Sequence, residues 1–178
     1  MKAYFISCLV LVFLVTSCKN DKSVNETVAE EVDKPFTVTF NAIVEKDDVF
    51  QVFYSEDGSE SFLPENAITI NVTGSPQPQD LVFTMPEDAS PMLIRFDIGA
   101  NPELKQVAFK SFKIEYLNKK TEGSSNDFFK YFYPNTQVEI DSLNTIAKIK
   151  ILEGEPYDPI LGSTIELKNE ILKLYNKN

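Results

Sequence analysis

The segment Phe36-Thr37-Val38-Thr39-Phe40-Asn41-Ala42 alternates strictly between apolar and polar residues. Successive side chains of a β-strand point to opposite faces, so this period of two predicts a strand with one buried face. The same kind of pattern recurs along the chain at residues 50–54, 68–73, 81–85, 92–98, 107–117 and 145–152. The body of the protein is therefore predicted to consist of short strands.

Glycine, proline and aspartate separate these strands. Such residues favour turns because proline fixes φ and glycine tolerates a positive φ. They gather at residues 57–58, 74–76, 86–91, 99–102, 123–124 and 154–156. Short strands joined by turns, with no helical pattern between them, are typical of an antiparallel sandwich or barrel. We expect an all-β fold, namely an antiparallel, jelly-roll-like β-sandwich of about seven to nine strands.

One helical pattern occurs near the end of the chain, at residues 163–176. Ser163-Thr164-Ile165-Glu166 resembles a capping box, in which a hydroxyl and a carboxylate satisfy free amides of the first turn. A broad apolar face follows, made of Ile165, Leu167, Ile171, Leu172, Leu174 and Tyr175. We expect this C-terminal α-helix to pack against one of the sheets. Docking on a partner protein is the alternative.

Residues 1–17 have the composition of a signal peptide. Lys2 precedes an apolar run over residues 5–15, which is shorter than the roughly 20 residues that a spanning helix needs. The run ends in Val15-Thr16-Ser17-Cys18, which resembles the lipobox of bacterial lipoproteins. This resemblance implies that the thiol of Cys18 receives a diacylglyceryl group before cleavage. An ordinary secretory signal that happens to carry a cysteine is the alternative.

The chain is therefore expected to have three parts: the signal peptide at 1–17, the lipidated cysteine with a flexible tether at 18–34, and the domain at 35–178. The tether is so polar that it cannot bury enough apolar surface to offset the entropy lost on ordering. The protein would be anchored to a membrane of the cell envelope through its N-terminal lipid. Lys19 stands where an aspartate would favour inner-membrane retention, which favours the outer membrane; the face it occupies, periplasmic or surface, stays open.

The composition excludes several function classes. The chain contains no histidine and no tryptophan, and its 27 acidic residues outnumber its 17 basic ones, for a net charge of −10. Without histidine there is no Ser-His-Asp triad and no imidazole base. The negative charge argues against nucleic acid as a partner. We therefore expect that the protein is not an enzyme and that it binds no cofactor and no metal ion.

Arg95, the only arginine of the chain, alternates with Ile94 and Phe96 and therefore points away from the buried face. Asp97 lies two residues further along the same strand, on the same face. One hypothesis is a ligand-binding pair, since guanidinium and carboxylate groups both bond sugar hydroxyls. The other, which we favour, is a structural ion pair that fixes a neighbouring loop or strand.

An aromatic run at residues 128–133 contains five aromatic side chains in six positions. Aromatic faces stack on sugar rings, and tyrosine adds a hydrogen bond, so Tyr131 and Tyr133 are further candidate ligand-binding residues. The alternative is that the run is buried or covers the sheet as a loop.

Carboxylates offer the remaining acid–base chemistry. Candidates are Asp47, Asp48, Glu56, Asp57 and Asp127, although their spacing selects no catalytic pair. The same loops have the oxygen ligands that a calcium ion prefers, but none has the pattern of an EF-hand. Separately, Asp141-Ser142-Leu143 is similar to an O-glycosylation acceptor triplet of bacterial periplasmic and surface proteins.

Spaced residues along the domain resemble those of a bacterial β-sandwich family. They are Phe50 to Tyr54, Phe62, the strand from Ile94 to Gly99, and Tyr157-Asp158-Pro159. The layout is similar to jelly-roll, carbohydrate-binding-module-like domains and would cover about residues 36–160. This resemblance implies a non-catalytic domain that binds a glycan or an envelope protein. A purely structural or assembly subunit without a small ligand and a carboxylate-dependent hydrolase are the alternatives.

Overall fold

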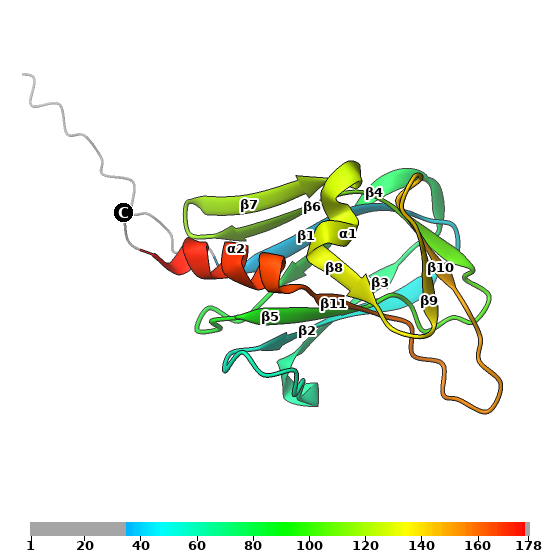
Figure 1. Cartoon of the computed structure of the whole chain (residues 1–178), viewed down its shortest axis with the longest axis horizontal. Helices are drawn as coiled ribbons and strands as arrows, with labels where there is room; N and C mark the ends of the chain where they lie inside the picture. Colours follow the sequence, from blue (N-terminus) through cyan, green and yellow to red (C-terminus); the bar gives the residue numbers. More distant parts are fainter. Residues whose placement is uncertain (1–34, 177–178) are drawn as a thin grey trace, which may run out of the picture. The chain divides into compact units, whose positions relative to one another are not determined.

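The computed structural model describes residues 35–176, which form a β-sandwich of two antiparallel sheets (Figure 1). Sheet A has the order β4 (Ser75–Thr84), β1 (Thr37–Val44), β6 (Gln106–Tyr116), β10 (Ile146–Ile149) and β9 (Val138–Asp141), and β7 (Lys119–Ser124) also pairs with β6. Sheet B has the order β3 (Ala67–Val72), β2 (Asp48–Ser55), β5 (Leu93–Asp97), β11 (Ile160–Ser163) and β8 (Phe132–Pro134). The predicted all-β sandwich with a C-terminal helix is confirmed.

The described region has eleven strands, more than the seven to nine expected from the pattern. Strands β8, β9 and β11 were not recognised because they span only three, four and four residues. A stretch of this length contains too few apolar positions to show an alternation. The sequence of β7, Lys-Lys-Thr-Glu-Gly-Ser, contains no large apolar side chain, and the turn predicted at residues 123–124 is wrong because these residues end β7. Long-range pairing supplies their hydrogen bonds instead.

The core lies between the two sheets and is rich in phenylalanine. Phe40 from sheet A and Phe96 from sheet B stack on one another, with ring centroids 4.1 Å apart and planes inclined by 8°. Seven further phenylalanines are fully buried beside them: Phe36, Phe50, Phe83, Phe109, Phe112, Phe128 and Phe132. Each buried ring removes a large apolar area from water, so these contacts supply much of the stability.

Strand β6 changes the parity of its inward side chains part-way along. Val107 and Phe109 are buried at odd positions, whereas Phe112 and Ile114 are buried at even positions. The register with β1 shifts at this point, and Lys110 is the extra residue of a β-bulge. The bulge keeps both halves of this long strand facing the core.

Helix α2 (Ile165–Tyr175) packs against strands of both sheets and buries Leu167, Ile171 and Leu174. Its N-cap is Thr164, whose hydroxyl accepts the amide of Leu167 at 3.3 Å. The expected capping box is therefore wrong: Ser163 is the last residue of β11, and with Thr164 as the N-cap the third helical residue is Leu167, which has no carboxylate to complete the box. The Ser163 hydroxyl accepts the amide of Ile94 at 2.8 Å and donates to its carbonyl.

Three shorter helical segments complete the described region. They are η1 (Pro64–Asn66), η2 (Ser125–Asp127) and α1 (Phe128–Tyr131). The sequence showed a helical pattern only at the C-terminus, since these segments are too short for a helical period to appear.

The predicted signal peptide, Cys18 and the tether lie outside the described residues. Within residues 35–176, no helix is long and apolar enough to span a membrane.

Candidate functional site

The outer face of sheet B carries the sequence-predicted pair on a central strand. In the register of this sheet, Phe53, Arg95, Gly162 and Tyr133 form one row across β2, β5, β11 and β8. A second row lies two residues further along the shared strands on the same face. It consists of Thr69, Gln51, Asp97 and Ile160. With strands about 4.8 Å apart, each row of four spans about 14 Å. The site is therefore assembled from strands that are far apart in sequence.

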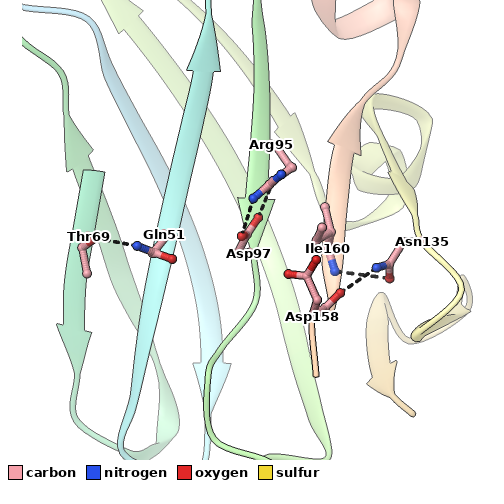
Figure 2. A network of polar contacts seen from close by, with 7 residues as sticks. All are labelled: Gln51, Thr69, Arg95, Asp97, Asn135, Asp158 and Ile160. Atoms are coloured by element: carbon pink, nitrogen blue, oxygen red, sulfur yellow. Dashed lines mark hydrogen bonds and ion pairs between the residues drawn. The ribbon is translucent and has the colours of Figure 1, made fainter. Parts of the chain in front are cut away.

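Arg95 and Asp97 form a two-point ion pair on this face (Figure 2). The Nε of Arg95 donates to Oδ1 of Asp97, and Nη2 donates to Oδ2, both at 2.8 Å. The two side chains are 25% and 14% exposed, so the pair is partly withdrawn from water. Within the described region, Nη1 of Arg95 has no hydrogen-bond partner. This leaves one edge of the guanidinium available to a ligand.

Two phenylalanine rings flank the same guanidinium. Its Cζ lies 4.2 Å from the ring centroid of Phe53 and 5.4 Å from that of Phe62. Phe53 comes from β2, whereas Phe62 comes from the loop that follows it. Both distances are within the range of cation–π attraction. The rings hold Arg95 in one orientation and give the face an apolar component.

Burial governs the titration of Asp97. Desolvation raises the pKa of its carboxyl above the ordinary value, and the negative charge of Asp158 adds to this effect. The hydrogen bonds and positive charge of Arg95 act in the opposite direction but do not cancel it. The charged form of Asp97 is therefore disfavoured by burial and stabilised by Arg95.

Tyr133 lies at the far end of the first row and is 43% exposed. Its hydroxyl donates to Oε1 of Glu60 at 3.3 Å. Burial raises the pKa of the Tyr133 hydroxyl, and the charge and hydrogen bond of Glu60 raise it further. The ring lies over Gly162, where a Cβ would stand 2.6 Å from the ring carbon Cζ. A glycine is thus needed for the ring to lie flat on β11.

These residues enclose a pocket of about 220 Å³ between Arg95, Phe62, Glu60 and Tyr133. Asn135 closes its side: the amide nitrogen donates to the carbonyl of Asp158 at 2.6 Å, and Oδ1 accepts the amide of Ile160 at 3.3 Å (Figure 2). Pockets for drug-sized ligands measure about 300–1,000 Å³. This one is smaller and fits a single ring-sized group.

Tyr131 does not belong to this site. It lies at the end of α1, where its ring packs on Phe112 with centroids 5.1 Å apart, and it lines a hollow beside α2. Phe128 and Phe132 from the same aromatic run are fully buried. The aromatic run therefore does not form one continuous surface, because it is divided between α1 and β8 and its side chains point in different directions. The structure brings together Arg95, Asp97 and Tyr133.

Each of the candidate carboxylates accepts at least one hydrogen bond, and several of the donors lie far away in the sequence. Asp48 accepts the amides of Val49, Ala100 and Asn101 at 2.7, 2.7 and 2.9 Å. Asp47 accepts the amide of Gly74, Glu56 that of Ser90, Asp57 that of Ser59, and Asp127 accepts the hydroxyl of Ser124. In residues 35–176, no three acidic or thiol side chains cluster in a way that would hold a metal ion.

Larger hollows occur elsewhere on the described region. One of about 360 Å³ lies on the outer face of sheet A between Asn41, Asp80 and Lys113, and one of about 470 Å³ lies beside Asp47 and Asn101. Most of the residues that line these two hollows are polar. We place the candidate site in the smaller pocket because it combines the exposed ring of Tyr133 with a guanidinium that has a free edge.

Sequence reasoning missed Phe53, Phe62, Glu60, Asn135 and Gly162 as members of this site. Phe53 carries a usable signal, since it is an aromatic residue out of phase with the buried Val52 and Tyr54. The others lie in loops or on short strands, so only the fold brings them beside Arg95.

No known protein family matches this chain, and no curated protein or solved structure is similar enough to match it. The fold and the site therefore define the protein by class alone. It contains an antiparallel β-sandwich, closed by a C-terminal helix, with a polar and aromatic pocket on the outer face of one sheet.

Proposed function

We propose that the chain is a membrane-anchored lipoprotein of the cell envelope whose β-sandwich binds a glycan, without catalysis, on the outer face of sheet B. The observation that carries this proposal is the aligned and ring-flanked guanidinium of Arg95, which faces a ring-sized pocket beside Tyr133. Sugar rings offer hydroxyl groups at their edges and C–H groups on their faces, and this pocket has complementary groups for both.

Each residue has a distinct role in the proposed complex. The exposed ring of Tyr133 stacks on the face of a sugar ring. Nη1 of Arg95 donates a hydrogen bond to a hydroxyl group, and the carboxylate of Glu60 accepts one. Asp97 does not need to touch the ligand, because its two bonds hold Arg95 in place.

The charge around the pocket favours a neutral glycan. Glu60 lines the pocket, Asp97 pairs with Arg95, and the charge of Asp158 acts on Asp97. These three carboxylates outnumber the one guanidinium, so a ligand that carries its own carboxylate or sulfate would be repelled.

The test is calorimetry or a glycan array with the purified protein. We expect dissociation constants between micromolar and millimolar, or roughly −4 to −8 kcal/mol, as shallow polar sites give. Tyr133→Ala should remove binding while the far-UV spectrum stays unchanged. Tyr131→Ala is the matched control, since it removes the same side chain outside the pocket and should leave binding intact. Loss of binding only in the control, or no binding of any glycan, would contradict the proposal.

A structural or assembly role is the second candidate, and the geometry of Arg95 also favours it. A guanidinium that makes two carboxylate bonds between two rings is a strong local tie between β2, β5 and the loop after β2. In that case the outer face of sheet B would contact an envelope protein. Arg95→Ala would then unfold the domain, and no glycan would bind to the unmodified protein.

The membrane anchor is tested separately through Cys18. Lipidation requires its thiol, so Cys18→Ser should abolish incorporation of an acyl label and release the protein from the membrane fraction. Label incorporation by the Cys18→Ser protein would contradict the proposed anchor. Neither result depends on the glycan site.

A further inference from the structure

The turn between β9 and β10 contains a serine whose side chain neither packs in the core nor makes a hydrogen bond within the described residues. Residues 142–145 form this turn, and Asp141 pairs with Ile146 at its base. Ser142 is exposed, and within the described region no hydrogen bond engages its hydroxyl. Its neighbour Leu143 is 97% exposed. A free hydroxyl therefore stands beside an aliphatic side chain that contributes nothing to the core.

The turn is held rigid from both sides. The carboxylate of Asp141 accepts the amide of Asn144 at 3.3 Å and its side-chain amide at 3.0 Å. Thr145 is buried, donates its hydroxyl proton to the carbonyl of Ser125 at 3.0 Å, and accepts the amide of Phe109 with its own carbonyl at 2.9 Å. The turn thus displays Ser142 and Leu143 on a backbone anchored at both ends, which lowers the ordering cost for an enzyme that binds it.

Leucine is an unusual choice for such a position. Turn tips normally carry glycine, asparagine, aspartate or serine, whose backbone preferences suit a turn. Burial of a leucine side chain contributes about 1.5–3 kcal/mol, and Leu143 forgoes this contribution entirely. The fold gives no reason for leucine here. Recognition of the turn by another protein does, since the side chain would be buried in that protein's binding site.

We propose that Ser142 is an acceptor for an O-linked glycan, and that a transferase recognises it through the Asp141 and Leu143 side chains on either side. The donor is a sugar carried on a phosphate leaving group, such as a polyprenyl diphosphate-linked oligosaccharide. Oγ of Ser142 forms a bond to the anomeric carbon, and the bond from that carbon to the phosphate oxygen breaks. The hydroxyl proton passes to a base of the transferase, and the electron pair leaves with the phosphate.

The local charge favours a glycosyl group over a phosphoryl group at this serine. A phosphate would bring up to two negative charges beside Asp141 in a chain that already has a net charge of −10. A neutral sugar adds no charge. Asp141 also keeps its contact with Lys148 at 3.6 Å, which a phosphate would disturb.

The site is independent of the glycan-binding pocket. Ser142 belongs to a hairpin of sheet A, whereas the pocket lies on sheet B. Covalent modification of Ser142 and non-covalent binding near Arg95 can therefore succeed or fail separately, although modification does rest on export of the chain to the compartment of the transferase.

The experiment uses the full chain purified from whole cells of its native host. Trypsin cleaves after Lys130 and Lys148, so one peptide, residues 131–148, carries Ser142. We expect mass spectrometry to find hexose-type increments on this peptide, with fragmentation that retains the glycan placing them on Ser142. Ser142→Ala should lose all of the added mass, and Ser142→Thr should retain it.

Two further measurements separate recognition from simple exposure. Leu143→Gln changes a side chain that the fold does not use and leaves the boundaries of the tryptic peptide unchanged, and it should lower the glycosylated fraction several-fold without changing the thermal unfolding midpoint. Ser61 is also exposed and lies between an acidic and an apolar residue, and its peptide should carry no sugar. An unmodified Ser142 peptide, a phosphate in place of the sugar, or full added mass in Ser142→Ala would overturn the proposal.

Discussion

Arg95 and Asp97 lie two residues apart on β5 and share two hydrogen bonds of 2.8 Å on the outer face of sheet B. An analogous pair of Lys113 and Glu115 lies on β6, also two residues apart and at 2.8 Å, but both side chains are 40% exposed. The two pairs share spacing and charge and differ in burial, geometry and aromatic contacts. The contribution of the Arg95–Asp97 pair to the free energy of unfolding can therefore be compared with that of the Lys113–Glu115 pair in the same protein.

The first prediction compares these two pairs. Arg95→Ala should lower the free energy of unfolding by about 2 kcal/mol, because two charged hydrogen bonds and two cation–π contacts are lost. Arg95→Lys should cost about half as much, since lysine keeps the charge but not the planar fork. Lys113→Ala should cost less than about 0.5 kcal/mol, as exposed pairs do. Urea unfolding measures the stability of all three variants. Equal losses for Arg95→Ala and Lys113→Ala would contradict the conclusion that the buried pair stabilises the fold more than the exposed one.

The second prediction concerns pH. The folded pKa of Asp97 is raised, so its contribution favours folding below the unfolded value of 3.8 and is lost as the pH rises through the folded value. The free energy of unfolding of the wild type minus that of Asp97→Asn should therefore fall as the pH rises from about 3 to about 6. This range extends from roughly one unit below the unfolded pKa to two units above it.

Asp57 should show the opposite slope and serves as the control. Hydrogen bonds from Ser59 and Ser55 lower the pKa of Asp57 from 3.8 to about 2. Its contribution is present above the unfolded value and is lost as the pH falls from 3.8 towards 2. The difference between the wild type and Asp57→Asn should therefore rise with pH over this window. Slopes of the same sign for the two variants would show that the titration of Asp97 is not governed by burial.

The third prediction concerns the position of the Tyr133 ring. Gly162→Ala would place a Cβ 2.6–2.8 Å from three atoms of that side chain, so the exposed ring has to move off β11. The bond to Glu60 should then break, and the pKa of the Tyr133 hydroxyl should fall towards 10.0. Spectrophotometric titration, taken as a difference against Tyr133→Phe, measures this change. An unchanged pKa would mean that the ring does not depend on Gly162.

The fourth prediction tests the link between the two sheets. Phe96→Ala should lower the free energy of unfolding by about 3–5 kcal/mol, because it leaves a cavity beside Phe40 and removes a stacked pair. Leu63→Ala provides the control: Leu63 is 48% exposed and should cost about 0.5 kcal/mol or less. Thermal or urea unfolding distinguishes the two, and a small loss for Phe96→Ala would contradict the packing.

The fifth prediction concerns the start of α2. Thr164→Ala removes the N-cap bond to the Leu167 amide and the bond that the hydroxyl donates to the Lys130 carbonyl. It should cost about 1–2 kcal/mol, and Thr164→Ser should cost little. Ser163→Ala removes the bonds to Ile94 instead, so it tests the β5–β11 contact. If Ser163→Ala, and not Thr164→Ala, reduced the helical part of the spectrum, the cap would be at Ser163.

Local pattern was sufficient for β1, β2, β5, β6 and α2, because period two and period 3.6 are properties of neighbouring residues. The alternation around Phe40 and around Ile94 predicted β1 and β5 and the direction in which Arg95 and Asp97 point. The aromatic run at 128–133 has no such regular period. Phe128 in the short helix α1 is buried and Tyr133 in β8 is exposed, and only the surrounding core decides which ring is buried.

The sequence by itself determined the class of fold and the Arg95–Asp97 pair, since two residues on one strand need no other element to meet. It also excluded histidine chemistry, since that depends on composition alone. Only the tertiary structure decided that Tyr133, Glu60 and Phe62 join this pair while Tyr131 does not. The physical reason is that strand order in a sheet is set by long-range pairing: β8 reaches Arg95 through β11, and β2 reaches it directly. No local period records which distant strands become neighbours.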